Sequence, residues 1–160
     1  EFYHFTDEQA ETALKKYREY FSTKGLFENK VYEGMPQFLI DQVAKDRQLL
    51  LATSKPEPFA KQILAYFGLD SYFTFIGGST MDGSRSTKTD VISYVLSANH
   101  VDDLSAVVMI GDRKHDIIGA ENNGIDSIGV LYGFGDEAEL RKAGATYIAA
   151  NLRELSTLLQ

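Results

Sequence analysis

Two acidic residues near the middle of the sequence have the type and spacing of a metal site. Asp112 and Asp116 belong to the segment 107–116, in which four apolar residues are followed by a glycine. The apolar run predicts a strand buried on both faces, with Asp112 at its carboxyl end and Asp116 a helical turn further on. Carboxylates at that edge of an open α/β sheet can hold a hard cation such as Mg²⁺. Alternatively, Asp112 caps the following helix and Asp116 complements its dipole.

Other polar residues follow a predicted strand or begin a predicted helix. Thr53 and Ser54 come after an apolar run, where hydroxyl and free N–H groups make a phosphate cradle, although Ser54 is also an ordinary helix cap. Lys88 begins a helix, and a cation there opposes the helix dipole unless an anion lies nearby; a solvated lysine is the alternative. Together, the hydroxyl, the lysine and the paired carboxylates predict a pocket for a phosphate group and a divalent cation.

The elements that position these residues alternate along the chain. Strands are predicted near residues 49–53, 73–76, 106–110, 127–131 and 146–149, with helices between them. Alternating β and α units of this length predict a parallel sheet covered by helices on both faces. A capping box from Thr6 to Gln9 predicts a further helix over residues 7–23, outside this rhythm, in an accessory element.

The composition restricts the possible partners. The 160 residues are 44% hydrophobic and 24% charged, which suits one globular domain. The net charge of −7 and the lack of a basic run argue against a nucleic-acid polymer as partner. The absence of cysteine excludes disulfides and thiol chemistry. No apolar run approaches the ~20 residues of a membrane helix. No secretory signal is visible, and we therefore expect a cytoplasmic protein.

In their order and spacing, these motifs resemble those of the haloacid dehalogenase-like (HAD) phosphatases, and within them the phosphoglycolate phosphatase-like branch. Residues 51–56, Leu-Ala-Thr-Ser-Lys-Pro, look like the second motif of that family, in which Thr53 matches the phosphate-binding hydroxyl. Lys88 matches the lysine of the third motif, although Thr89 replaces the proline that usually follows it. Residues 110–116 look like the acidic Gly-Asp-x₃-Asp form of the fourth motif.

The resemblance implies a fold and a domain division. We expect a Rossmann-like three-layer sandwich with a parallel sheet over residues 31–160, and the carboxyl-terminal part of a helical cap with its hinge over residues 1–30. The first motif of the family, an Asp-x-Asp on an amino-terminal strand, does not occur in this sequence. We therefore expect the nucleophile and the first core strand in an upstream segment that the sequence lacks.

The function that the resemblance implies is the hydrolysis of a small phosphate monoester through an aspartyl-phosphate. Candidates are phosphoglycolate, a nucleotide or a sugar phosphate. Asp112 would bind Mg²⁺ directly, and Asp116 would orient metal-bound water or pair with Lys88. Thr53 and the N–H of Ser54 would hold phosphate oxygens, and Lys88 would stabilise the nucleophile and the phosphate.

Three alternatives remain at this point. The first is a catalytically inactive HAD-like remnant or regulatory binding domain. The second is a receiver domain of the flavodoxin-like fold, which needs an acidic pair and a phosphoacceptor aspartate that are not visible here. The third is a true dehalogenase, against which the acidic fourth motif argues.

Overall fold

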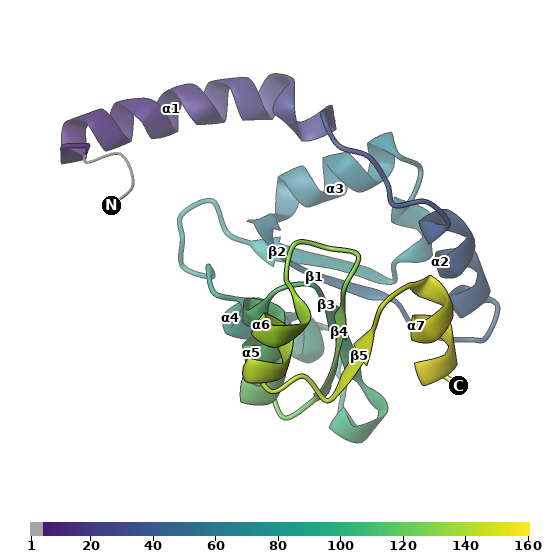
Figure 1. Ribbon diagram of the computed structural model, residues 1–160. Coiled ribbons are helices and arrows are strands. Elements are labelled where there is room, and N and C mark those ends of the chain that lie inside the picture. The colour runs from purple at the N-terminus through teal and green to yellow at the C-terminus, as the bar shows by residue number, and fades with distance from the viewer. Residues whose placement is uncertain (1–4) are drawn as a thin grey trace.

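The computed structural model describes residues 5–160, in which seven α-helices and five β-strands alternate (Figure 1). The strands are β1 (Leu50–Pro56), β2 (Phe75–Ser79), β3 (Val108–Gly111), β4 (Asp126–Val130) and β5 (Tyr147–Ala149). The helices are α1 (Asp7–Thr23), α2 (Met35–Val43), α3 (Glu57–Tyr66), α4 (Lys88–Ala98), α5 (Lys114–Asn122), α6 (Glu137–Lys142) and α7 (Leu152–Leu158). Three short 3₁₀ turns, η1 (Gly25–Phe27), η2 (Asp70–Tyr72) and η3 (Leu104–Ala106), lie between them.

Every strand pair is parallel, as predicted, but the strands form two sheets. One sheet consists of β1 and β2, and the other has the order β3-β4-β5. Within the described residues no ladder joins β1 to β3. The prediction that β3 is buried on both faces is wrong, because Val108, Met109 and Ile110 are only half-buried. The strand that is buried is β4, which has a ladder on each side.

Helices cover both faces of the strands, which confirms the three-layer architecture. On one face, Val108 and Ile110 of β3 pack into a core with residues of α2 and α7, among them Phe38 and Leu155. On the other face, Met109 of β3 and Ala52 of β1 pack against one cluster from α4, α5 and the turn after α5, formed by Ile92, Leu96, Ala120 and Ile125. Because strands of both sheets pack on this one cluster, the two sheets share a helix layer. Burial of a large apolar side chain stabilises the fold by roughly 1.5–3 kcal/mol.

All five strands have slightly different boundaries from those predicted, and two of the differences bear on the site. β1 continues to Pro56, so Ser54 lies in a strand and does not cap α3. β2 begins at Phe75, because Tyr72 belongs to the preceding 3₁₀ turn, and it includes Gly77 and Gly78. A Cβ at Gly78 would lie 2.5 Å from the Lys55 carbonyl oxygen. The glycine therefore allows β1 and β2 to approach each other where β1 ends.

The helix α1 lies apart from the strands, across the top of the molecule in Figure 1. Its predicted capping box is confirmed, since the Thr6 side chain accepts from the Gln9 N–H and the Gln9 side chain accepts from the Thr6 N–H. None of its residues is buried. Its contacts with the rest of the chain include Phe21, whose ring lies edge-on to Phe59 at 5.8 Å, and Tyr20, whose hydroxyl donates to the Glu28 carboxylate. Within residues 5–160, no helix is both long and apolar enough to span a membrane.

Candidate phosphate and metal site

Lys88 forms a largely buried ion pair beside Ala52 of β1. Its Nζ donates to the carbonyl oxygen of Ala52 at 2.7 Å and lies 2.8 Å from Asp116 Oδ1. The Lys88 and Asp116 side chains are only 14% and 7% exposed. The alternative of a solvated lysine is therefore wrong. A lysine at the start of a helix is unfavourable unless an anion lies nearby, and here that anion is Asp116.

The packing of α4 against α5 positions Lys88 beside Ala52 and Asp116. Gly119 of α5 allows the close approach, since a Cβ there would lie 3.2 Å from the Lys88 carbonyl carbon. The side chain of Asn123 donates to the Thr89 carbonyl oxygen at 3.1 Å, and that of Asn122 donates to Thr89 Oγ1 at 3.0 Å. Thr89, which stands where proline is usual, thus links the start of α4 to the end of α5.

Asp116 uses both of its carboxylate oxygens within the protein. Oδ1 pairs with Lys88, and Oδ2 accepts the backbone N–H of Arg113 at 3.0 Å. Gly111 makes room for this, because a Cβ there would overlap the Asp116 side chain. Asp116 therefore fixes Lys88 and the first turn of α5 together, which agrees with the prediction that it pairs with Lys88. Its position in the first turn of α5 also complements the helix dipole.

Asp112 is held by the loop that follows β4. Its Oδ2 accepts the backbone N–H of Phe134 at 2.8 Å, and its carbonyl oxygen accepts the N–H of Gly135 at 2.9 Å. A Cβ at Gly133 would overlap the Asp112 carboxylate. Asp112 does not cap α5, whose N-cap residue is Arg113. Among the described residues, no hydrogen bond or ion pair reaches Asp112 Oδ1, which leaves that oxygen for a ligand.

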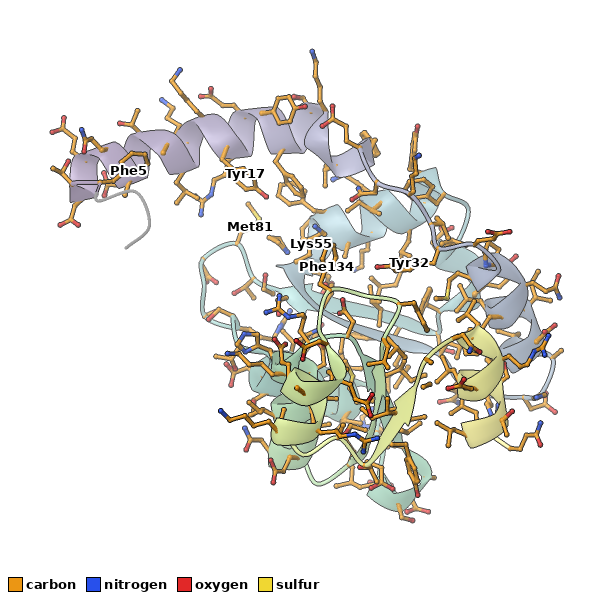
Figure 2. The ribbon with its side chains drawn as sticks, viewed as in Figure 1. Phe5, Tyr17, Tyr32, Lys55, Met81 and Phe134 are labelled. Carbon is orange, nitrogen blue, oxygen red and sulfur yellow. The ribbon has the colours of Figure 1, made fainter. Side chains whose placement is uncertain are left out.

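Thr53 and Ser54 lie in the middle of β1, which continues to Pro56. Thr53 is half-buried and its Oγ1 accepts the N–H of Lys55 at 3.2 Å, whereas Ser54 is exposed. A cavity of about 410 Å³ lies beside them, between β1, the loop after β2, and α1. Its lining includes Arg18, Phe21, Ser54, Lys55, Phe59 and Met81. In Figure 2, Tyr17 points from α1 toward the side of the molecule where Lys55, Met81 and Phe134 lie.

Two side chains near the site have shifted pKa values. Burial lowers the pKa of Lys55, whose Nζ lies 4.7 Å from the centre of the Phe21 ring. Burial, with the nearby Tyr32 and Asp112, raises the pKa of Tyr132 to about 12, so this phenol stays neutral at physiological pH. Tyr132 packs edge-on against Tyr32 at 5.5 Å. Phe134, in contrast, is 86% exposed.

The sequence did not reveal the role of Glu139 on α6. Its Oε1 accepts both Arg113 Nε at 2.8 Å and the Lys114 N–H at 2.9 Å. These two hydrogen bonds, that from Arg113 first, lower the pKa of the Glu139 carboxyl. The pKa of Arg113 is raised mainly by Glu139, and less by Asp112 and Asp116. No local motif links residues this far apart, so only the fold identifies the contact. His115, which lies between Asp112 and Asp116 in the sequence, is exposed to solvent.

The arrangement fits a cation that is bound largely by substrate and water. Within residues 5–160, no group of three or more His, Cys, Asp or Glu could hold a metal ion. Mg²⁺ is commonly bound through one or two carboxylates, with phosphate oxygens and waters completing the shell. Asp112 Oδ1 can supply one such ligand, while Asp116 is fully engaged with Lys88 and the Arg113 N–H. Of the two acids, Asp112 is therefore the suitable direct ligand.

The chain belongs to the haloacid dehalogenase-like hydrolase family, whose model matches residues 1–130. The chain is 42% identical to a 5'-nucleotidase of Pseudomonas aeruginosa over 160 residues, which cover 99% of this chain and 71% of that protein. It is 37% identical to the tyrosine-protein kinase PtkA of Mycobacterium tuberculosis over 154 residues, covering 95% of this chain and 53% of the kinase. The chain thus spans only about half the length of that relative.

Further similarities support the phosphoglycolate phosphatase-like branch. The chain is 30% identical to a phosphoglycolate phosphatase of Colwellia psychrerythraea over 129 residues, which are 80% of this chain and 56% of that protein. A crystal structure described as a predicted phosphatase from Clostridium acetobutylicum superposes with a TM-score of 0.91 at 46% identity. It covers 99% of this chain, and this chain covers 73% of it. The family and fold predictions are confirmed, and the receiver-domain alternative is wrong.

Proposed function

We propose that the protein hydrolyses a small phosphate monoester. The observation that carries this proposal is the largely buried Lys88–Asp116 pair beside β1, a strand in which Thr53 offers a hydroxyl. A positive charge fixed beside β1, together with the carboxylate of Asp112 directly after β3, suits a phosphoryl group and its counter-ion. The 5'-nucleotidase and phosphoglycolate phosphatase relatives support this reaction class.

The substrate class that we propose is a small phosphorylated metabolite. A nucleoside monophosphate, phosphoglycolate and a sugar phosphate are the candidates, and the nucleotidase relative, at 42% identity, favours the first. The cavity of about 410 Å³ beside Ser54 and Lys55 is large enough for a small leaving group. Arg18 and Lys55 line this cavity and can attract an anionic substrate. Such local cations are needed because the chain as a whole carries a net charge of −7.

Each site residue has a proposed role. The hydroxyl of Thr53 and the N–H of Ser54 hold non-bridging phosphate oxygens, and Lys88 stabilises the charge that develops on them. Asp116 holds the Lys88 side chain in place through their ion pair, so it is a positioning residue. Asp112 Oδ1 is the ligand for Mg²⁺, which supplies neutralisation of the phosphoryl charge when bound.

The chemical step that we propose is double displacement at phosphorus. An aspartate oxygen attacks phosphorus and the bond to the substrate oxygen breaks, with a proton passing from a neighbouring acid to the leaving oxygen. Water then attacks the aspartyl-phosphate, the acyl oxygen–phosphorus bond breaks, and inorganic phosphate leaves. We place the attacking aspartate on a strand outside the 160 residues, because the sequence has no Asp-x-Asp motif.

The two sheets support that placement. β1 and β3 each have a ladder on one side only, yet both pack on the cluster around Ile92. A further parallel strand between them would complete one sheet, and its carboxyl end would lie between Thr53 and Asp112. On this proposal, residues 31–160 are the catalytic core, and residues 1–30 belong to a cap and its hinge. The cytoplasmic location also stays a prediction.

Rapid acid quenching tests this mechanism in the natural protein that contains these residues. With ³²P-labelled phosphate monoester and Mg²⁺, we expect a labelled, hydroxylamine-sensitive protein adduct together with released phosphate. Turnover without an adduct would contradict the aspartyl-phosphate step. A protein that forms neither an adduct nor phosphate would favour the inactive regulatory domain.

A second candidate follows from the kinase relative. At 37% identity to PtkA, the chain could belong to a protein that passes the phosphoryl group to a tyrosine hydroxyl instead of water. The same quench experiment distinguishes the two reactions when a tyrosine-containing peptide is present. Label recovered as phosphotyrosine favours the kinase, and label recovered as inorganic phosphate favours the phosphatase.

A further inference from the structure

We propose that Glu139 is a positioning residue for the cation site, because it holds the Arg113 guanidinium away from the carboxylates of Asp112 and Asp116. The proposal rests on the proposed function, since it assigns a cation to Asp112. Glu139 itself touches neither carboxylate. It would act on the site through Arg113, the residue next to Asp112, by pairing with its guanidinium.

A single oxygen of Glu139 accepts two hydrogen bonds from residues 112–116, the segment that contains both site acids. Oε1 accepts from Arg113 Nε at 2.8 Å and from the Lys114 N–H at 2.9 Å. The second contact satisfies one of the first N–H groups of α5, which have no partner within their own helix. Glu139 therefore fixes both the Arg113 side chain and the start of α5 from a helix that begins more than twenty residues later.

Arg113 is well placed to interfere with the site if it is released. It follows Asp112 directly, and its backbone N–H already donates to Asp116 Oδ2 at 3.0 Å. A guanidinium forms strong, often bidentate, pairs with carboxylates. A released Arg113 would compete with a cation for Asp112 and with Lys88 for Asp116. The ion pair with Glu139 prevents both.

The position of Glu139 is itself tied to Asp112. The Glu139 N–H donates to Asp136 Oδ1 at 2.7 Å, which caps α6. The residue before Asp136 is Gly135, whose N–H donates to the Asp112 carbonyl oxygen at 2.9 Å. The contacts thus form a ring. They run from Asp112 to the loop after β4, from there to Glu139 at the start of α6, and back through Arg113 to Asp112. A change at Glu139 is transmitted to Asp112 by two routes, the loop and Arg113.

Calorimetric titration with Mg²⁺ tests the proposal without any measurement of turnover. We would compare Glu139→Ala, Arg113→Ala and the double variant in the natural protein that contains these residues. Glu139→Ala is expected to weaken Mg²⁺ binding roughly tenfold, the low end for residues that support a metal ligand. The double variant is expected to recover most of that loss, because no guanidinium remains to compete. A double variant that binds as weakly as Glu139→Ala would overturn the proposal.

Two further variants provide matched controls. Glu137→Ala removes another carboxylate from α6, one that pairs with Arg141 at 2.7 Å in solvent, and should leave Mg²⁺ affinity unchanged. Glu139→Gln keeps an acceptor for the Lys114 N–H but loses the charge, and should bind with intermediate affinity. Equal binding by the unchanged protein and Glu139→Ala overturns this inference alone. Failure of the unchanged protein to bind Mg²⁺ overturns the proposed metal role together with it.

Discussion

Lys88 Nζ lies 2.8 Å from Asp116 Oδ1, and only 14% and 7% of the two side chains are exposed, so the two residues form an ion pair that is largely shielded from solvent. Breaking a buried pair leaves an uncompensated charge. We therefore expect Lys88→Ala to lower the free energy of unfolding by about 3 kcal/mol as well as to abolish turnover. Urea denaturation followed by circular dichroism measures the first effect.

The double variant Lys88→Ala/Asp116→Ala separates stability from catalysis. Removal of both charges should restore much of the lost stability, because neither partner is left unpaired. Turnover should remain abolished, since the double variant lacks the Lys88 ammonium that is proposed to stabilise the phosphate charge. Equal destabilisation by the single and double variants would show that the pair is not the cause of the stability loss.

The loop after β4 provides a second test, at Gly133. A Cβ at this position would overlap the carboxylate of Asp112, so Gly133→Ala should displace the proposed cation ligand. We expect a large rise in the Mg²⁺ concentration needed for half-maximal turnover, with little change in secondary structure.

Gly68→Ala is the matched control for Gly133→Ala. Gly68 has a φ of 65° and no atom within 4 Å of an added Cβ. The substitution should therefore cost stability, about 1 kcal/mol from the left-handed backbone alone, but leave the Mg²⁺ requirement unchanged. If both variants changed the requirement alike, strain and not contact with Asp112 would explain the effect.

The lowered pKa of Lys55 predicts that replacing this residue changes the free energy of unfolding by an amount that depends on pH. Burial lowers its pKa from 10.5, so folding disfavours the charged ammonium, and the contact with Phe21 offsets part of that cost. The cost is fully present below the lowered pKa and disappears as the pH rises through that pKa toward 10.5. Lys55→Met should therefore stabilise the protein at pH 7, with a smaller gain at pH 10, as measured by urea denaturation. The exposed Lys45→Met should show no such pH dependence.

The sequence predicted what depends on local chemistry. The caps at Thr6 and Asn151 were predictable, because a side chain and an N–H two or three residues later suffice to make them. The meeting of Lys88 with Asp116 followed from the parallel α/β order, which brings strand ends together at one edge. The half-burial of β3 could not be predicted, because it depends on which strands lie beside it in the sheet.

Two contacts at the site could not be predicted from the sequence. The Phe134 N–H that reaches Asp112 is a backbone group, which no residue type reveals. Glu139 reaches Arg113 from a helix 26 residues away, and many exposed acids of this chain have an equally plain sequence context. Tertiary packing alone selects Glu139 from among them.

Turnover of p-nitrophenyl phosphate tests the central claim most directly. The natural protein that contains these residues would be assayed with and without Mg²⁺, beside its Asp112→Ala and Asp102→Ala variants. Asp102 lies in an exposed loop away from the site, so its variant controls for the loss of one acidic charge. We predict Mg²⁺-dependent turnover that Asp112→Ala abolishes and Asp102→Ala leaves intact, and none from the 160 residues alone. Turnover that survives Asp112→Ala, or its absence from the natural protein, would contradict the proposed phosphatase site.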